Sequence, residues 1–444
     1  AMGAPTEKDT AHEGGEVQKR ELRTVTWEEV QKHNTRKDCW IVIEDLVYDA
    51  SKFIPYHPGG SIMARWAGMD ATDVFYAFHG EEKGSPGMKA LPRYLIAKLD
   101  KPLTLAAHVK DFRALRKEVQ AEGLMKASPR WFTAVFGFYF SLYLTALLVL
   151  WYGPRTILTT LISATIMGCC WAQGGLLQHD LGHNSIFPTG KKNYFFHVLF
   201  YTLFMGGSPD WWRGRHTRHH ASPNDGEVDL DVRTLPLFAW DKKQFKKSNQ
   251  NIVKWQCYYW PFLGPPVLLW VYRVLNSLWM IRTVNLFENI CCAVHFAVLG
   301  YLTYMGSTFN AVTWWLWTLM TGGAYLGWVF AFNHTMFPIY RSPDERDWLS
   351  ATLTTTQNVT PSFLVDYITG HLDYQVEHHL WPRMPRHNYE VVHPRLMALC
   401  KKHGFTFYEE GFFSAIISVF RTLHTATLPE TPEEAKQPFN PKHF

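Results

Sequence analysis

The alternation of hydrophobic and polar residues changes near residue 130. Before it, apolar runs are short: residues 40–50 (WIVIEDLVYDA) are rich in β-branched and aromatic residues around an acidic break, which predicts a β-hairpin. Thr26, with Glu29 three positions later, predicts a helix start, and residues 61–79 return to helical spacing. We therefore expect a compact α+β domain over 25–100, after a polar, disordered tail at 1–24.

Long uncharged segments follow. Residues 131–152 hold no charge over 22 positions, about 33 Å as a helix, and residues 156–178 are again uncharged after the turn at 153–155. Further spans are expected at about 290–305 and 311–332, separated by Gly306 and Ser307. These four spans predict an all-α integral membrane domain over 131–425, with a linker or amphipathic helix at 101–130 and a tail at 426–444.

One more apolar segment, 255–272, is uncharged but contains Pro261, Gly264, Pro265 and Pro266. Because proline removes a helical hydrogen bond, we expect this segment to be interfacial or re-entrant rather than spanning.

The distribution of positive charge orients the spans. Seven Lys and Arg residues lie between 101 and 130, whereas the 153–155 turn carries one Arg. The positive-inside rule then places the N-terminus, the 179–289 loop and the C-terminal region in the cytosol.

Composition agrees with a membrane protein and excludes other classes. The 19 Trp, 20 Tyr and 30 Phe residues suit aromatic belts at a bilayer surface. A net charge of +5 without a basic, aromatic-interleaved strip does not indicate nucleic-acid binding. The seven Cys residues form no CxxC framework and are typical of reduced thiols.

Three histidine clusters lie just outside predicted spans, all on the predicted cytosolic side. They are HDLGH at 179–183, HTRHH at 216–220 and QVEHH at 375–379, the last with Gln in the first position. On a helix, positions i, i+3 and i+4 share one face, so the imidazoles of each cluster can reach one ion. The candidate metal ligands are His179, His183, His216, His219, His220, His378 and His379.

Two further histidines are weaker candidates. The face of the third cluster extends backwards to His371, and His334 ends the predicted fourth span. His334 could instead be an ordinary interfacial histidine, and a single HxxHH triple arises by chance in about one of twenty such chains. Three clusters together favour a metal site. Seven imidazoles exceed the four ligands of zinc and suit two first-row ions, with iron the natural choice for O₂ chemistry.

A second kind of site is predicted in the N-terminal domain. His57 begins HPGG at 57–60 and His79 ends the next helical segment, in AFHG at 77–80. HPGG alone would be a simple turn, but two histidines in a domain of this size favour haem. Ligation by both leaves no open position, so the haem could transfer single electrons but not bind O₂.

These motifs resemble two known families. Residues 25–100 resemble cytochrome b5, through HPGGS and WAGMDATDVFYAFH, and residues 130–410 resemble the membrane fatty-acid desaturases, through HDLGH, HTRHH and QVEHHLWPRMPRHN. The fusion, with Gln375 leading the third cluster, is similar to the front-end desaturases of delta-5, delta-6 or delta-8 type, which insert a double bond between an existing one and the carboxyl end.

The resemblance implies a di-iron centre held by the seven cluster histidines, with no separate catalytic acid or base. Gln375 stands where related acyl-CoA desaturases have a ligating histidine, and His334 resembles an extra ligand of those relatives. Asp229-Leu230-Asp231 replaces what is often Asp-Pro-Asp in the family.

The expected reaction is O₂-dependent, front-end cis desaturation of a long-chain polyunsaturated acyl-CoA or acyl-lipid. Electrons would pass through haem b, bound by His57 and His79. The chain has no GxGxxG motif between a strand and a helix, so an external NADH-cytochrome b5 reductase is expected, with the enzyme in the endoplasmic reticulum membrane. Head-group phosphates could be bound by cations that could equally well follow the positive-inside rule, namely Lys191, Lys192, Arg213, Arg215 and Arg218.

Three alternatives accompany this interpretation. A sphingolipid long-chain-base desaturase would share the clusters. A cytochrome b5-fused lipid hydroxylase would use similar iron chemistry, but such enzymes resemble all-His arrangements, against the Gln-first cluster. A non-enzymatic, membrane-anchored haem electron carrier predicts one C-terminal anchor and no histidine clusters. Regioselectivity does not follow from the sequence, because one methylene in an apolar channel changes binding by only about 1–3 kcal/mol.

Overall fold

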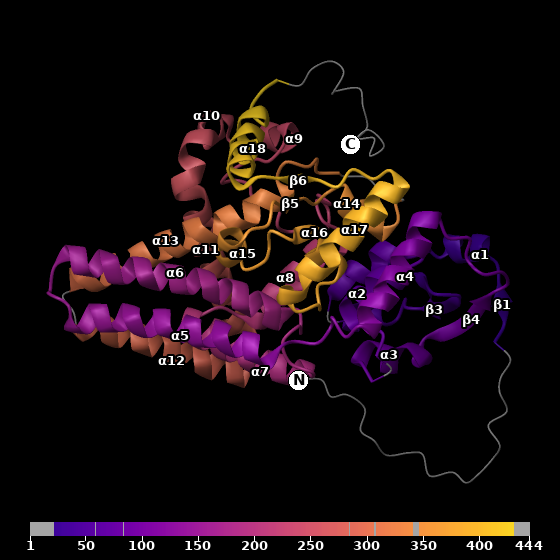
Figure 1. Cartoon of the computed structure of the whole chain (residues 1–444), viewed down its shortest axis with the longest axis horizontal. Coiled ribbons are helices and arrows are strands. Elements are labelled where there is room, and N and C mark those ends of the chain that lie inside the picture. The colour runs from indigo at the N-terminus through magenta and orange to yellow at the C-terminus, as the bar shows by residue number, and fades with distance from the viewer. Residues whose placement is uncertain are drawn as a thin grey trace, which may run out of the picture.

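The computed structural model describes residues 22–429, except 58, 83, 284, 306–307 and 341–345. The predicted tails therefore lie largely outside the described residues, as do Gly306 and Ser307. A small α+β domain occupies one end of the molecule, and the turn between helices α5 and α6 lies at the opposite end (Figure 1).

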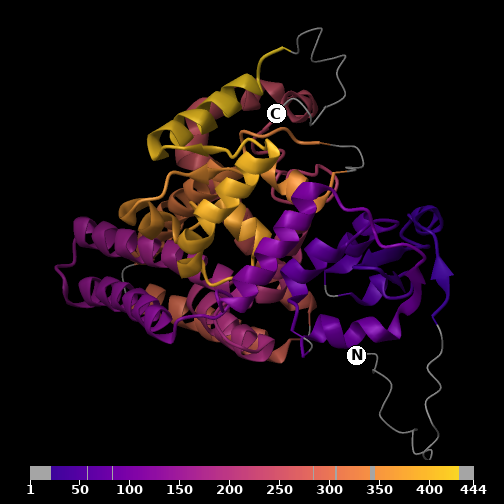
Figure 2. The same cartoon turned by 45° about the vertical axis from the view of Figure 1, so that its right-hand side comes forward.

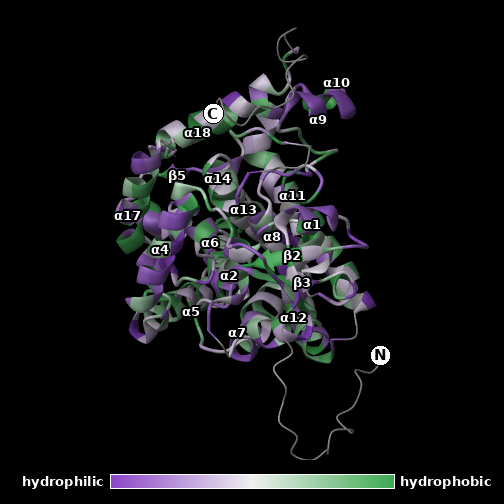
Figure 3. Ribbon diagram, turned by 90° about the vertical axis from the view of Figure 1, so that its right-hand side faces the viewer, coloured by the Kyte–Doolittle hydropathy of each residue, from purple (hydrophilic) through white to green (hydrophobic). Residues whose placement is uncertain are grey.

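The N-terminal domain is built on a four-stranded sheet in the order β1-β4-β3-β2. The predicted hairpin is confirmed: β2 and β3 pair antiparallel, with Trp40 opposite Asp49. Four apolar side chains make β2 the hydrophobic strand that is green in Figure 3. The strands are β1 (Thr24–Val25), β2 (Trp40–Ile43), β3 (Leu46–Asp49) and β4 (Leu95–Leu99).

The helices of this domain follow local capping signals. Thr26 Oγ1 accepts a hydrogen bond from the Glu29 amide and begins α1, as predicted. The predicted helical stretch 61–79 is two elements, a 3₁₀ helix (Gly60–Trp66) and α2, because Gly68 has a φ of +75° between them. The α-helices are α1 (Trp27–Lys32), α2 (Thr72–His79) and α3 (Pro86–Ala90), with short 3₁₀ turns at Ile54–Tyr56 and Leu91–Arg93.

The predicted linker contains helix α4 (Ala107–Ala121), which joins the two halves of the molecule. Its Arg113 and Arg116 form ion pairs with Asp73 on α2. On its other side, the Phe112 ring lies 5.4 Å from the ring of Trp381, near the C-terminal helices. The linker is therefore a structural element between the domains.

Two helices are long and apolar enough to cross a membrane among the residues described, α5 (Pro129–Tyr152) and α6 (Ile157–Gly182). They form the antiparallel hairpin predicted for 131–178 (Figure 1). The expected third and fourth spans are helices, α12 (Leu286–Met305) and α13 (Thr308–His334), but neither meets the same criterion. The structure thus gives two candidate spans where the sequence predicted four. Helix α13 contains several Trp, Thr and Gly residues, which make it less apolar than α5.

Residues 255–272, expected to be interfacial or re-entrant because of their prolines, are not among the candidate spans of the described residues, yet they are helical. Helix α11 (Gln256–Arg282) is continuous, with Pro261, Pro265 and Pro266 inside it. Packing explains why it persists: a Cβ on Gly327 of α13 would lie 2.0 Å from the Cβ of Pro265, so the glycine admits the proline ring. Tertiary contact here outweighs the local cost of proline.

The remaining elements form a cap over one end of the long helices. It comprises α7 (Gly190–His197), a π-helical turn (Val198–Leu203), α8 (Pro209–Ala221), α9 (Lys242–Lys247), α10 (Gln250–Val253), α14 (Trp348–Leu353), β5 (Asn358–Val359), α15 (Phe363–Thr369), α16 (Gln375–Leu380), a 3₁₀ turn (Arg386–Asn388), α17 (Tyr389–His403), β6 (Glu409–Glu410) and α18 (Phe412–Thr425).

One hydrophobic cluster runs from the N-terminal domain into this cap. It includes Ile62 and Trp66 of the domain, Leu115 of α4, and Trp348 and Leu396 of the cap. Figure 2 shows the domain and α4 lying directly against the C-terminal helices. The two halves therefore share a core.

Candidate metal centre

The three histidine clusters, far apart in the chain, converge beneath the cap. The last turn of α6 carries His179, and His183 follows the helix directly. Helix α8 carries the second cluster; it begins at Ser208, whose Oγ accepts from the Trp211 amide, with Pro209 in its first turn. The short helix α16 carries the third cluster and is entirely buried.

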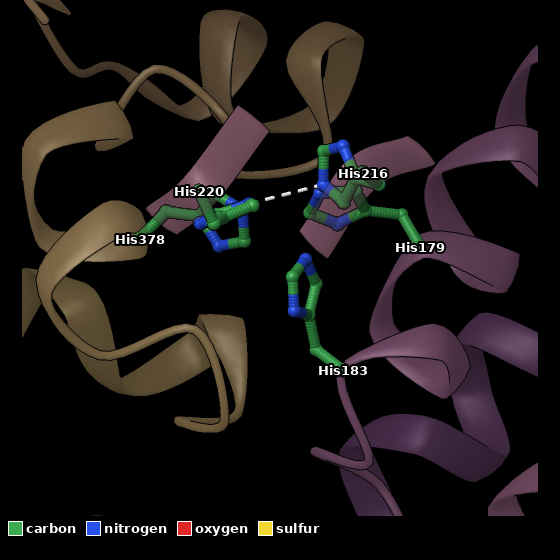
Figure 4. A group of neighbouring side chains, drawn as sticks. All are labelled: His179, His183, His216, His220 and His378. Atoms are coloured by element: carbon green, nitrogen blue, oxygen red, sulfur yellow. Dashed lines mark hydrogen bonds between the residues drawn. The ribbon is translucent and has the colours of Figure 1, made fainter. Parts of the chain in front are cut away.

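The histidines divide into two groups whose candidate ligand atoms lie within 4.8 Å of one another. Figure 4 shows the five rings of the first group turned toward a common space. The first group is His179, His183, His216, His220 and His378; the second is His219, His334 and His379.

This division changes the expectation that each cluster faces one ion. His219 and His220 are neighbours in sequence but belong to different groups, as do His378 and His379. Adjacent residues on a helix point about 100° apart, so each HH pair contributes one imidazole to the first group and the other imidazole to the second group. The repeated HH pair is what makes two neighbouring sites possible.

The first group presents nitrogen atoms that lack other partners. Nε2 of His220 lies 3.0 Å from Nε2 of His216 and 3.0 Å from Nε2 of His378. Nε2 of His183 is buried with no hydrogen-bond partner. Burial lowers the pKa of His183 to about 3, which keeps the ring neutral. Neutral, convergent imidazoles fit a first-row transition metal.

Contacts outside this group fix the orientation of a ligand. The Tyr389 hydroxyl lies 2.9 Å from Nδ1 of His378, so that Nε2 points into the group. The ring of His216 stacks on Trp212 at 4.4 Å. No spacing in the sequence signals Tyr389, which lies 11 residues after His378 on another helix.

The second group is tuned by a carboxylate. Burial opposes protonation of His219, but Asp229 lies 2.9 Å from its Nδ1, and the net effect is a raised pKa. Both nitrogens of His379 are buried without a partner, and Nδ1 of His334 donates to the Thr355 carbonyl at 3.0 Å. Despite Leu230 in place of the common proline, Asp229 thus contacts a candidate ligand, as outer-shell carboxylates do in metal sites.

Gln375 lies beside the second group. Asn333 donates from Nδ2 to the Leu372 carbonyl at 3.0 Å and to Oε1 of Gln375 at 3.2 Å. Since a backbone carbonyl only accepts, this pair of bonds fixes the Asn333 amide. The Gln375 amide then turns its oxygen to Asn333 and its nitrogen to Nε2 of His334, at 3.1 Å.

His371 belongs to neither group. Helix α16 begins at Gln375, and His371 lies before it with a φ of +62°. Its ring contacts Trp131 and Tyr374 instead. The helical face predicted to extend back to His371 is interrupted by this turn.

The N-terminal domain presents the other predicted pair of ligands. The rings of His57 and His79 face each other with centroids 6.1 Å apart, and Nδ1 of His57 is buried without a hydrogen-bond partner. Burial lowers the pKa of His79 to about 4. Both rings line a cavity of about 1850 Å³ with apolar walls that include Ile62, Trp66 and Phe75, which fits a haem.

This cavity extends to the histidine groups, because cap residues also line it. His183 is among them, and the Phe78 ring lies 6.5 Å from the ring of His220. Besides the ion pairs made by α4, Arg65 pairs with Asp225 at 2.9 Å and Glu82 of the domain pairs with Arg383 at 3.2 Å, which hold the domain to the cap.

A separate cavity of about 270 Å³ reaches both histidine groups from the side of the long helices. His179, His216 and His219 line one part of it, and the lining is otherwise mostly apolar, with Trp171 and Leu326 among its side chains. Such a space can hold a chain-like apolar molecule beside the metal ligands.

The cations predicted to bind head groups are not gathered in one place. Arg215 lines the 270 Å³ cavity and pairs with Asp231. Arg213 and Lys191 line the cavity of His57 and His79, Arg218 approaches Gly60, and Lys192 is exposed.

Comparisons with known proteins match both halves of the chain. The family model "Fatty acid desaturase" matches residues 155–411, and "Cytochrome b5-like Heme/Steroid binding domain" matches residues 26–100. The chain is 35% identical over 418 residues to "Fatty acid desaturase 3" of Bos taurus and 34% identical to that of Homo sapiens, covering 90% of this chain and 93% of each relative.

A third relative and a solved structure also match. The chain is 31% identical over 409 residues to "Acyl-lipid (9-3)-desaturase" of Physcomitrium patens, covering 89% of this chain and 77% of that one. Cytochrome b5 of Ostreococcus tauri virus 2 aligns over 18% of this chain and 99% of its own, with 38% identity and a TM-score of 0.16.

Proposed function

The chain belongs to the fatty acid desaturase family and carries a fused cytochrome b5-like domain, and we propose that it is a front-end desaturase of long-chain polyunsaturated acyl groups. It is an oxidoreductase by this membership. The observation that carries the proposal is the convergence of eight histidines into two groups beside an apolar cavity.

The two groups would each hold one iron ion. The first-group ligands would be His179, His183, His216, His220 and His378, and the second-group ligands His219, His334 and His379. Bound there, iron supplies the oxidising power that removing hydrogen from an unactivated methylene requires, with O₂ as co-substrate.

The protein's own contribution is orientation and exclusion of water. Tyr389 orients His378, and Asp229 orients His219 while increasing its basicity. The apolar wall around Trp171 and Leu326 would hold the acyl chain against the histidines. In this dry space an acyl methylene meets the site in a fixed position.

Gln375 would act without ligating iron. Because the amide oxygen of Gln375 accepts a hydrogen bond from Asn333, its amide nitrogen presents an N–H donor toward the second group. A donor cannot bind a cation, so its role would be to hydrogen-bond an acceptor at this site. The Gln-first cluster would then leave three imidazoles in the second group and five in the first.

Electron delivery would follow the docked N-terminal domain. One double bond formed with reduction of O₂ to two waters requires two electrons and two protons beyond those of the substrate. The two electrons would arrive one at a time through the haem held by His57 and His79. Phe78 is one residue before His79 and touches His220, which places one side chain between the haem pocket and the first group.

The environment and the domain limits belong to the same proposal. Residues 25–100 would form the haem domain, and 131–425 the membrane desaturase domain. Helices α5 and α6 would span the endoplasmic reticulum membrane together with α12 and α13, with both termini cytosolic. Lipid substrate would enter from the bilayer, and a separate NADH-cytochrome b5 reductase would supply electrons.

Two other lipid-modifying enzymes differ from the proposed one in substrate or product. A long-chain-base desaturase and a lipid hydroxylase would use the same iron groups. The Gln-first cluster supports desaturation over hydroxylation, and the product analysis below distinguishes an acyl substrate from a long-chain base.

The test is expression in yeast supplied with a panel of polyunsaturated fatty acids, followed by location of new double bonds by mass spectrometry. We expect one new cis double bond between an existing one and the carboxyl end. A hydroxylated product, or a product found only in the sphingoid bases, would contradict the proposal. A variant with His216→Ala and His220→Ala serves as the inactive control.

A further inference from the structure

Helix α11 places an arginine in the interior of the helical bundle. Arg273 donates from Nη1 to the Met205 carbonyl and from Nη2 to Nε2 of His295, both at 2.6 Å. Its guanidinium lies over the rings of Trp171 and Trp315, at 5.2 and 5.7 Å from their centroids. These rings attract a cation but carry no net charge.

Among the residues that the structure describes, the charge of Arg273 has no counter-ion. Nδ1 of His295 donates to the Leu203 carbonyl, so its Nε2 is a neutral acceptor. Among the residues described, Arg273 forms no ion pair with an Asp or Glu. Other interior arginines do: the pairs are Arg65–Asp225, Arg113–Asp73, Arg116–Asp73, Arg215–Asp231 and Arg386–Asp180.

An unpaired cation in an apolar interior is unfavourable unless a ligand supplies it with a hydrogen-bond acceptor or a negative charge. Ionisable residues at such depth mark functional sites more often than structural ones. The protein also keeps space for it: Gly206 has a φ of +71°, and a Cβ there would lie 3.0 Å from Nη2 of Arg273 and 2.8 Å from the His295 ring. Only glycine fits this position.

Arg273 lines the same 270 Å³ cavity as His179, His216 and His219. Trp171, which touches Arg273, and His179 are eight residues apart on α6, a rise of about 12 Å. The cavity is thus lined by Arg273, by candidate metal ligands and by mostly apolar side chains; Arg215 also lines it but pairs with Asp231. A molecule with one polar end and an apolar chain matches this lining.

We propose that Arg273 binds the oxygen of the carboxyl-end carbon of the acyl substrate, and so sets the position of the new double bond by its fixed distance from the histidine groups. This rests on the proposed desaturase function and adds to it the determinant of regioselectivity. A chain anchored at its carboxyl end presents the same carbon to the irons whatever its total length. The shared chemistry is an acyl carbonyl or carboxylate oxygen, whether from a free acid, a thioester or a phospholipid ester.

The test compares purified, full-length, haem- and iron-loaded enzyme with Arg273→Gln and Arg273→Lys. The matched control is Arg282→Gln, which removes the same charge from the exposed end of the same helix. Binding of one radiolabelled polyunsaturated chain is measured without O₂, as free acid, CoA thioester and phosphatidylcholine ester. Turnover in air then gives KM, kcat and the double-bond position.

We expect Arg273→Gln to weaken anaerobic binding at least tenfold for the carrier that the enzyme uses, to raise KM more than it lowers kcat, and to spread the double bond over neighbouring positions. Arg273→Lys keeps a cation and should weaken binding less, and Arg282→Gln should match wild type. The carrier that loses most binding identifies the source of the oxygen. Haem absorbance and iron content verify that each variant is folded.

Unchanged binding of all three probes together with an unchanged double-bond position in Arg273→Gln would overturn the anchor. If Arg273→Gln does not fold, the test rests on Arg273→Lys. Normal binding and an unchanged double-bond position in Arg273→Lys, together with a strongly altered pH profile, would overturn the anchor equally. Failure of the proposed function has a different signature: wild type would form no desaturated product. Anaerobic binding would still report on Arg273 in that case.

Discussion

The amide nitrogen of Gln375 lies 3.1 Å from Nε2 of His334, while its amide oxygen is held by Asn333. The residue that interrupts the third histidine cluster therefore faces the second group as a hydrogen-bond donor. From the sequence alone, Gln375 could be an oxygen ligand of the metal or a neighbour of the ligands. The orientation of its amide favours the second role.

Gln375→His should keep iron bound but lower or redirect turnover, since it replaces an N–H donor with an imidazole that can ligate. Gln375→Leu, which removes the donor without adding a ligand, should also retain iron and lose activity. Metal analysis and product identification check both. Loss of iron in Gln375→Leu would indicate that Gln375 is a ligand after all.

Asp229→Asn should weaken iron binding by about 10- to 100-fold, the usual cost of removing an outer-shell carboxylate. The neutral amide no longer raises the pKa of His219 or fixes its tautomer. Iron content after dialysis against a graded chelator series measures the effect. Asp231→Asn is the comparison, because Asp231 is 3.9 Å from His219. Equal losses in both variants would contradict a specific role for Asp229.

His57→Ala should abolish turnover supported by NADH and reductase while leaving iron in place, because haem and iron occupy separate sites. The haem absorbance bands report the loss of haem, and metal analysis reports retained iron. His33→Ala, in the same domain but stacked on Trp40, should keep both. Iron loss in His57→Ala would refute the two-site arrangement.

Phe78→Leu should slow reoxidation of reduced haem by substrate and O₂ several-fold, since it removes the ring that bridges to His220. Stopped-flow absorbance at the haem bands measures this step directly. Phe75→Leu is the control: Phe75 packs on His79 at 4.7 Å and lines the same pocket. If both substitutions slow reoxidation alike, the effect arises at the haem and not at the bridge.

Iron-free protein should become less stable as pH falls below about 6.5. The folded protein holds His183 neutral with a pKa of about 3, whereas the unfolded chain takes up a proton near pH 6.5. Between these pH values the unfolded state binds more protons than the folded state. Each such histidine therefore lowers the free energy of unfolding by about 1.4 kcal/mol for each unit that the pH falls. His216, His220, His378 and His379 share the same direction of shift.

Thermal unfolding of chelated protein between pH 5 and 8 measures this slope. His393 shifts in the other direction, because Glu377 raises its pKa against the effect of burial. Its contribution is fully present below pH 6.5 and is lost as pH rises through the higher folded value. His393→Gln should therefore lower stability by a constant amount below pH 6.5, leave the slope there unchanged, and lose that difference from wild type above the folded pKa. A melting temperature independent of pH would show that the groups are not held neutral.

The sequence identified the candidate ligands but not their division into two groups. HTRHH and QVEHH predict helix faces rich in imidazole, and the structure places these histidines together. Which imidazole joins which group depends on how α6, α8, α13 and α16 meet, and no local spacing carries that information. Tyr389 and Asn333 are tertiary neighbours of the ligands, and they could not be found from spacing.

Errors in the fold prediction have similar causes. Three prolines in 255–272 favoured an interfacial or re-entrant segment, but the structure shows a continuous helix, in which Gly327 of α13 accommodates one of the prolines. His371 fits the helical spacing of the third cluster, yet the preceding left-handed Gly370 redirects the chain. In both places a glycine decided the outcome through backbone geometry or contact, which hydrophobic periodicity does not register.

The hydrophobic cluster shared by the haem domain, α4 and the cap has a kinetic consequence. A donor that packs into its acceptor's core delivers electrons in a first-order process, at a rate that dilution in the membrane does not change. Added soluble cytochrome b5 should then neither compete nor accelerate. Under the proposed function, the concentration-dependent step would be the encounter with the reductase, which would have to meet the docked domain twice for every double bond formed.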